Sequence, residues 1–130
     1  MQTKTIFIFG NQELDIDSLP LKILPGLRQL FLSINFEAKD SNEEWSVPEK
    51  MIVIDTVVGL KKVTVFEDFD SFDSAPRLTM HDFDALANLR YLKKLGKLKE
   101  IMIIGVPPNM SENEAIESIS KIIKGLATSQ

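Results

Sequence analysis

Among the side chains of this sequence that can bind metal ions, three have positions that could bring them together. His81 is the only histidine, and it stands where a helical pattern begins. Asp17 and Asp55 each follow a run of branched and aromatic residues typical of a buried strand. If these runs are parallel neighbours, their carboxyl ends lie at one edge of the sheet, where open α/β sheets bind ligands. Two carboxylates and one imidazole suit zinc, nickel or iron better than magnesium, which prefers oxygen ligands alone.

Each of these residues also has a purely structural explanation. Asp17 directly precedes a Ser-Leu-Pro segment and could serve only as an acid beside a helix start. Asp55 could accept backbone hydrogen bonds in the turn after its strand. The helix dipole disfavours a protonated imidazole at His81. Metal binding needs the neutral ring, but a neutral ring is equally compatible with a histidine that is only exposed to solvent. The three residues are therefore weak signals when taken one at a time.

Length and composition describe an ordinary globular chain. The 130 residues fit a single domain, 1–130. The composition, with 44% hydrophobic and 26% charged residues, disfavours a disordered or fibrous protein. The absence of cysteine excludes disulfides, thiolate metal sites and cysteine nucleophiles, and is compatible with a cytoplasmic location. We expect a cytoplasmic protein.

Charge and hydropathy bear on the classes of partner. The net charge of −4 argues against a nucleic-acid partner, because such proteins gather Lys and Arg on one face. The basic cluster at 90–99 has helical spacing beside apolar residues and indicates a solvated helix face. Segment 1–9 has only four consecutive apolar residues, too few for a signal peptide or a membrane span. We therefore expect no membrane insertion.

The apolar pattern predicts the elements that would position the three residues. The expected strands are 5–9, 31–36, 51–54, 63–66 and 101–104, and the expected helices begin at residues 19, 81 and 112. The link from 56 to 62 is shorter than the roughly dozen residues that a parallel crossover needs, so strand 63–66 should run antiparallel to strand 51–54. We expect an α/β three-layer sandwich, with a mostly parallel five-stranded sheet, one antiparallel strand and helices on both faces.

Capping and turn residues predict where the elements end. Pro25 and Gly26 should shorten or kink the first helix, and Thr79 is a possible cap for a helix over 81–95. The capping box at 111–114 should begin the last helix, which Gly125 should end. The remaining polar stretches, 40–50 and 67–73, are expected to be loops.

In chain order, the pattern resembles the hydrogenase maturation endopeptidase family over nearly the whole sequence. The residues that carry the resemblance are Gly10-Asn11, Asp17, Ile52-Val53-Ile54-Asp55, Thr79-Met80-His81 and Ile103-Ile104-Gly105-Val106-Pro107-Pro108. Members of this family remove a C-terminal extension from the large-subunit precursor of nickel-iron hydrogenases after nickel has been inserted.

The resemblance implies roles for the three candidate residues. By position in the motif, Asp17, Asp55 and His81 would contact the metal and form the catalytic site. Asp15 offers an alternative register for the first acid. The family is thought to hold no tightly bound cofactor of its own and to recognise nickel in the precursor, so the partner would be that large-subunit precursor. Segments near Trp45 and at 69–76 could then grip it.

Other readings of the same residues remain open. A non-catalytic metal-checking or scaffold protein of this fold would keep the three residues without peptidase turnover. A receiver-like phosphoacceptor domain also places acids after its first and third strands, but it needs a helix after Asp55 and a lysine after its last strand. The sequence instead has the short link at 56–62 and Gly105-Val106-Pro107-Pro108.

Overall fold

The computed structural model describes residues 4–10, 18–39, 47–73, 79–80 and 83–128. It has six strands and four helices within those residues. In chain order they are β1 (Lys4–Phe9), α1 (Leu19–Leu30), β2 (Ile34–Lys39), β3 (Lys50–Val58), β4 (Thr64–Phe66), α2 (Phe69–Asp73), β5 (Thr79–Met80), α3 (Phe83–Lys94), β6 (Glu100–Val106) and α4 (Glu112–Thr128).

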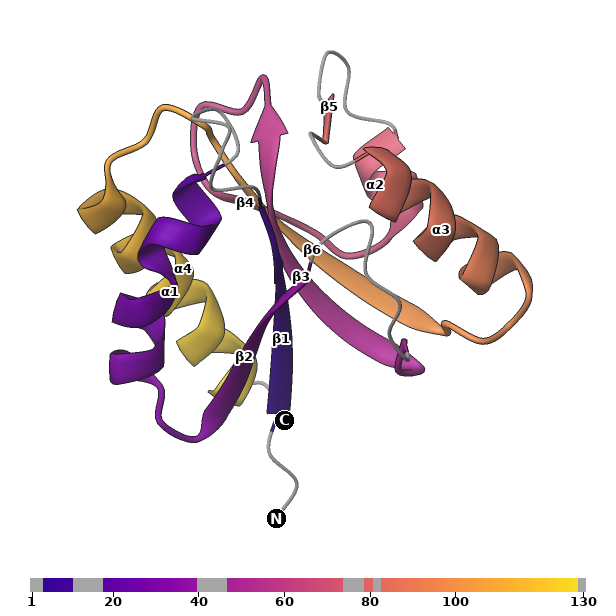
Figure 1. Cartoon of the computed structure of the whole chain (residues 1–130), viewed down its shortest axis with the longest axis horizontal. Helices are drawn as coiled ribbons and strands as arrows, with labels where there is room; N and C mark the ends of the chain where they lie inside the picture. The colour runs from indigo at the N-terminus through magenta and orange to yellow at the C-terminus, as the bar shows by residue number, and fades with distance from the viewer. Residues whose placement is uncertain (1–3, 11–17, 40–46, 74–78, 81–82, 129–130) are drawn as a thin grey trace.

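The strands form a sheet in the order β2-β1-β3-β6-β4. β2, β1, β3 and β6 are parallel to their neighbours, and β4 runs antiparallel to β6. This confirms the predicted mostly parallel five-stranded sheet with one antiparallel strand. The short β5, which the sequence pattern did not predict, pairs antiparallel with the end of β3. The helices lie on both sides of the sheet, with α1 and α4 on one face and α2 and α3 on the other (Figure 1).

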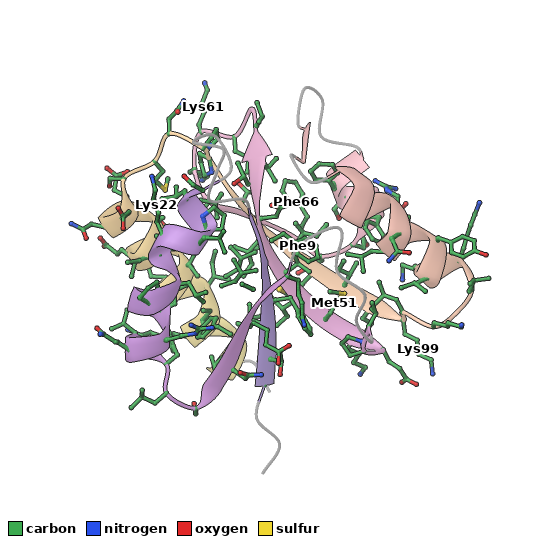
Figure 2. The ribbon with its side chains drawn as sticks, in the orientation of Figure 1. Phe9, Lys22, Met51, Lys61, Phe66 and Lys99 are labelled. Atoms are coloured by element: carbon green, nitrogen blue, oxygen red, sulfur yellow. The ribbon has the colours of Figure 1, made fainter. Side chains whose placement is uncertain are left out.

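Alternation along the central strands divides the apolar side chains between two cores. On β1, Ile6 and Ile8 belong to the core under α1 and α4, while Phe7 and Phe9 belong to the core under α2 and α3. This is the period-two pattern of a strand buried on both faces, as expected for a central parallel strand. Figure 2 shows the side chains filling the space on each side of the ribbon.

Helix α1 continues through the Pro-Gly pair that was predicted to shorten or kink it. It runs to Leu30 and ends where the backbone N–H of Phe31 donates to the Leu27 carbonyl at 3.0 Å. The buried apolar stripe of the helix stabilises it against the hydrogen bond that proline removes. Gly26 has a packing role instead: a Cβ there would lie 2.9 Å from Cδ1 of Ile116 on α4.

The last helix begins as predicted but does not end at Gly125. The Ser111 hydroxyl accepts a hydrogen bond from the Glu114 backbone N–H at 3.2 Å, which is the expected N-cap. The helix then continues to Thr128, three residues beyond Gly125. Gly125 is therefore an interior helix residue, because the following residues continue the helix at the modest cost that one glycine imposes.

Other boundaries also differ from the sequence prediction: β3 continues to Val58 and β6 to Val106, beyond the predicted ends at 54 and 104. β2 begins at Ile34 rather than at residue 31, because Phe31 ends α1 first, although its edge position is as expected. Segment 67–73 was expected to be a loop, but it contains the short helix α2. Thr79 was expected to cap a helix from residue 81; it lies in β5, and α3 begins at Phe83. No helix among the described residues is long and apolar enough to cross a membrane.

Candidate functional site

The candidate site lies at the edge where the parallel strands end. β1 ends at Phe9, while β3 continues past its last partner on β6, Val106, to Val58. Its final residues pair instead with β5, so that Val57 is opposite Met80 and Val58 is opposite Thr79. Figure 1 shows this end of β3 projecting beyond the centre of the sheet toward β5. The extension brings a segment from far along the chain to the carboxyl end of β3.

Asp55 is the predicted site residue that the structure describes, and it occupies a core position on β3. Its neighbours at alternate positions, Val53 and Val57, both belong to the core under α2 and α3, so alternation directs Asp55 toward that face. The residue is 0% exposed. Its Oδ1 accepts a hydrogen bond of 2.8 Å from the backbone N–H of Thr56. A buried carboxyl group is costly unless it is hydrogen-bonded, and this hydrogen bond offsets part of that cost.

Gly105 lies directly opposite Asp55 on β6. A Cβ at Gly105 would lie 2.9 Å from both Leu60 Cδ1 and Val57 Cγ2, and 3.3 Å from Phe66 Cε2. These three side chains occupy the space that a larger residue would need. The predicted strand ended at residue 104, but Gly105 lies inside β6, which ends one residue later. Its tight surroundings depend on side chains far apart in the sequence, so no local pattern indicates them.

The other two predicted ligands, Asp17 and His81, lie outside the described residues, as do Asp15 and Asn11. Their neighbours in the sequence are described. Met80, which precedes His81, pairs with Val57, two residues after Asp55 on β3. Whether the three predicted ligands meet stays a prediction. In the part of the chain that the structure describes, no three His, Cys, Asp or Glu side chains are grouped to hold a metal ion.

Ser18 follows Asp17 and begins α1 at the same edge. Its backbone carbonyl accepts hydrogen bonds from Leu21 N–H at 3.1 Å and Lys22 N–H at 3.0 Å, and the residue is 2% exposed. The Ser18 side chain makes no capping hydrogen bond to the helix. The helix thus begins at the predicted residue without a hydroxyl cap from Ser18.

Of the two segments predicted to contact a client, the structure describes only part of one. Trp45 lies outside the described residues. Phe69 and Phe72, from the segment 69–76, are only 6% and 7% exposed. Phe72 packs edge-to-face on Phe66 with ring centroids 5.3 Å apart, and the Arg90 guanidinium lies 4.8 Å from the centroid of the Phe69 ring. These two phenylalanines pack in the core, and contact of their segment with a client stays a prediction.

The receiver-like alternative does not fit the observed topology. The connection between β3 and β4, residues 59–63, contains no helix, and β4 is antiparallel to its neighbour β6. Asp55 is also fully buried, whereas a phosphoacceptor must be reached by its phosphodonor. The fold therefore contradicts this alternative.

Comparison with solved structures gives full-length matches at low sequence identity. The hydrogenase maturating endopeptidase HybD from E. coli matches with a TM-score of 0.67 and 17% identity, over 97% of this chain and 93% of that chain. An uncharacterized protein from Wolinella succinogenes matches with a TM-score of 0.58 and 10% identity, over 97% of both chains. The hydrogenase 2 maturation peptidase from a Thaumarchaeota archaeon matches with a TM-score of 0.52 and 18% identity, over 98% of this chain and 99% of that chain.

These matches establish the class of fold. The chain has the α/β fold of hydrogenase maturation peptidases, which confirms at the level of architecture the resemblance seen in the sequence. The sequence matches no protein-family model, and no curated protein matches it either.

Proposed function

We propose that this protein is an endopeptidase that removes the C-terminal extension of a nickel-iron hydrogenase large-subunit precursor after nickel insertion. In this proposal Asp17, Asp55 and His81 contact the nickel that the precursor carries. The observation that carries the proposal is a buried carboxylate at the carboxyl end of a central strand, in a fold shared with two maturation peptidases. We also propose that the protein acts in the cytoplasm, where it would meet the precursor.

The described neighbours of the two other ligands support this grouping. Met80 pairs beside the end of β3, and His81 is the next residue in the sequence. Ser18 begins α1 at the same edge, and Asp17 is the residue before it. Segments that are far apart in the sequence thus approach the strand end that carries Asp55. This arrangement is what a site built from loops at the carboxyl edge requires.

The ligand set suits recognition of a metal held by another protein. Two carboxylates and one imidazole can bind nickel, but they compete poorly with thiolates for a soft or borderline ion. Such a site can test whether nickel is present without removing it from a thiolate-rich centre. The nickel belongs to the substrate, and contact with it would also orient the adjoining polypeptide for cleavage.

The burial of Asp55 adds a requirement to this proposal. Because the residue is 0% exposed, its carboxylate reaches a metal on the precursor only if precursor binding displaces the groups that cover it. Binding must therefore include a local rearrangement at this edge. Peptidase action would then be coupled to recognition, since an unbound enzyme would keep the carboxylate covered.

A second candidate function follows from the same burial. The hydrogen bond from Thr56 N–H to Asp55 Oδ1 is what a purely structural acid at a strand end would also make. It therefore fits the scaffold form of the non-catalytic alternative, in which Asp55 need not contact a metal, whereas a metal-checking protein would still use Asp55 as a ligand. Such a protein would bind the precursor without cleaving it, so binding and cleavage must be measured separately.

His81→Ala tests the proposed role of the histidine. We expect this variant to lose processing of nickel-loaded precursor while its thermal unfolding stays close to that of the parent. Asn88→Ala, at an exposed position of α3, is the control and should process at the parent rate. Cleavage by His81→Ala at the parent rate would show that the metal-contact assignment is wrong. Precursor capture without cleavage by the parent protein would favour the scaffold alternative.

A further inference from the structure

The connection from β3 to β4 crosses the end of the strand that lies between them. β6 is parallel to β3 and occupies that middle position, so the connection passes its carboxyl end, close to Gly105. Gly59 begins the connection with φ of 104°, a conformation that glycine adopts without strain, and the chain turns there. Leu60 follows and packs against the core under α2 and α3. The connection therefore places Leu60 on the face of the sheet that carries Asp55.

The Leu60 side chain fills a position beside Asp55. Gly105 is directly opposite Asp55 on the neighbouring strand, and neighbouring strands are about 4.8 Å apart. Cδ1 of Leu60 lies 2.9 Å from the place where a Gly105 Cβ would stand. Leu60 thus takes the side-chain position that the glycine leaves empty in the layer that contains Asp55. It therefore contributes to the burial of Asp55, which is 0% exposed.

Three side chains surround the position over Gly105, and they differ in how they are held. Val57 is 0% exposed and belongs to the part of β3 that is paired with β5. Phe66 is paired with β6 and packs edge-to-face on Phe72, with ring centroids 5.3 Å apart. Leu60 belongs to no strand or helix, is partly exposed and directly follows a glycine. It is therefore the one of the three that can leave without breaking hydrogen bonds of the sheet.

We propose that Leu60 is a movable cover of Asp55 and that it moves away when the polypeptide substrate binds. This inference rests on the proposed function, and it names the group whose displacement that function requires. The space that Leu60 leaves is lined by Gly105 and by the apolar side chains of Val57 and Phe66, so an apolar group of the substrate takes its place. Because the covered form cannot bind substrate in this way, the apparent affinity is reduced by the fraction of molecules in which the cover is open.

Chemical labelling of Asp55 in the free protein tests the cover directly. A water-soluble carbodiimide with an added amine modifies carboxyl groups that solvent reaches, and peptide mass spectrometry measures the rate at Asp55. For Leu60→Ala we expect labelling of Asp55 about tenfold faster than in the parent. Val63→Ala is the matched control, because Val63 is a partly buried aliphatic residue of the same connection but packs against the core under α1 and α4. This control should be labelled at the parent rate.

Kinetics with nickel-loaded precursor test whether substrate binding displaces the cover. Leu60→Ala removes the cost of opening, so KM should fall about fivefold, while the cleavage step of bound precursor keeps the parent rate. Leu60→Met restores a side chain of similar volume, so both its labelling rate and its KM should return to the parent values. Unfolding curves confirm that each variant is folded.

The possible outcomes separate this inference from the proposed function. Labelling of Asp55 at the parent rate in folded Leu60→Ala, or faster labelling with an unchanged KM, contradicts the inference and leaves the proposed function standing. If the parent does not process a competent precursor, the proposed function is wrong and the substrate step falls with it. The labelling rates alone then still decide whether Leu60 covers Asp55. If Leu60→Ala does not fold, Leu60→Val makes the same comparison with a smaller truncation.

Discussion

The two faces of the sheet are built from different side chains. The core under α1 and α4 is almost entirely aliphatic, with Phe36 as its one buried aromatic residue among those described. The core under α2 and α3 contains five buried phenylalanines, at positions 7, 9, 66, 69 and 72. That second face also receives Asp55 and, opposite it, Gly105. The aliphatic face includes the buried hydroxyl of Thr56, but the aromatic face is the one interrupted by a buried carboxyl group, that of Asp55.

The difference arises at two core positions that do not carry the apolar side chains found at the neighbouring positions. On β3 the alternation Met51, Val53, Asp55, Val57 gives one core position to a carboxylate, and on β6 the matching position is a glycine. Apolar residues at both positions would bury more apolar surface. Proteins accept such local costs mainly at functional sites. The interruption is therefore the feature of this face on which the proposed site rests.

The largest expected effect comes from neutralising the buried acid. Asp55→Asn keeps the size of the side chain and an oxygen that can accept the Thr56 N–H, so the variant should fold. It removes the charge that a metal contact needs, so we expect processing to be lost.

Thr56→Val changes the adjacent residue, whose side chain lies on the opposite face of the sheet, and it serves as a control. The Thr56 Oγ1 is buried and has no hydrogen-bond partner among the described residues. Removing that hydroxyl should raise the free energy of unfolding by about 1 kcal/mol.

Processing assays and denaturant unfolding of both variants measure these effects. Parent-like processing by Asp55→Asn would mean that the interruption of the aromatic face is structural. The comparison of the two faces would then lose its functional meaning.

A pair of glycine substitutions compares the packing of the two faces. Gly105→Ala should destabilise the protein by about 1–3 kcal/mol, because its Cβ would meet three side chains that are themselves buried or partly buried. Gly26→Ala, on the aliphatic face, would meet mainly the flexible tip of Ile116 and gains the better helix propensity of alanine. We expect Gly26→Ala to change the free energy of unfolding by less than about 1 kcal/mol. Urea unfolding that gives equal costs at the two glycines would contradict this account.

The smallest expected effect concerns Asp68, at the start of α2 on the aromatic face. The Ser71 backbone N–H donates to Asp68 Oδ1 at 2.7 Å, and this hydrogen bond lowers the pKa of Asp68 below 3.8. Because the folded pKa is depressed, the stabilisation is present above pH 3.8 and is lost as pH falls through the folded pKa. Asp68→Ala should therefore be slightly less stable than the parent at neutral pH and equal to it in strong acid. Unfolding curves across pH test this, and a gap that persists in acid would contradict it.

Much of the fold follows from local patterns in the sequence. The runs at 5–9, 51–54 and 101–104 are buried on both faces, and the short link after Val58 indicates the antiparallel β4. The errors arose where tertiary contacts override local signals. α1 continues through Pro25 because its stripe is buried, and Phe69 and Phe72 form a short helix because their rings pack into the core.

The candidate site was predictable only in part. Asp55 could be identified because it follows a strongly apolar run, although the structure places it inside β3, which continues to Val58. Its complete burial could not be predicted, since it depends on groups brought from other parts of the chain. The pairing of Thr79 and Met80 with β3 is also non-local and only two residues long, too short to give a strand pattern.

The central claim is tested most directly by incubating the purified protein with nickel-loaded and nickel-free large-subunit precursor and measuring the intact mass of the precursor. We predict loss of a C-terminal peptide from the nickel-loaded form alone. Cleavage of both forms would contradict recognition of nickel. An unchanged mass of a precursor that a known maturation peptidase does cleave would contradict the proposed peptidase activity.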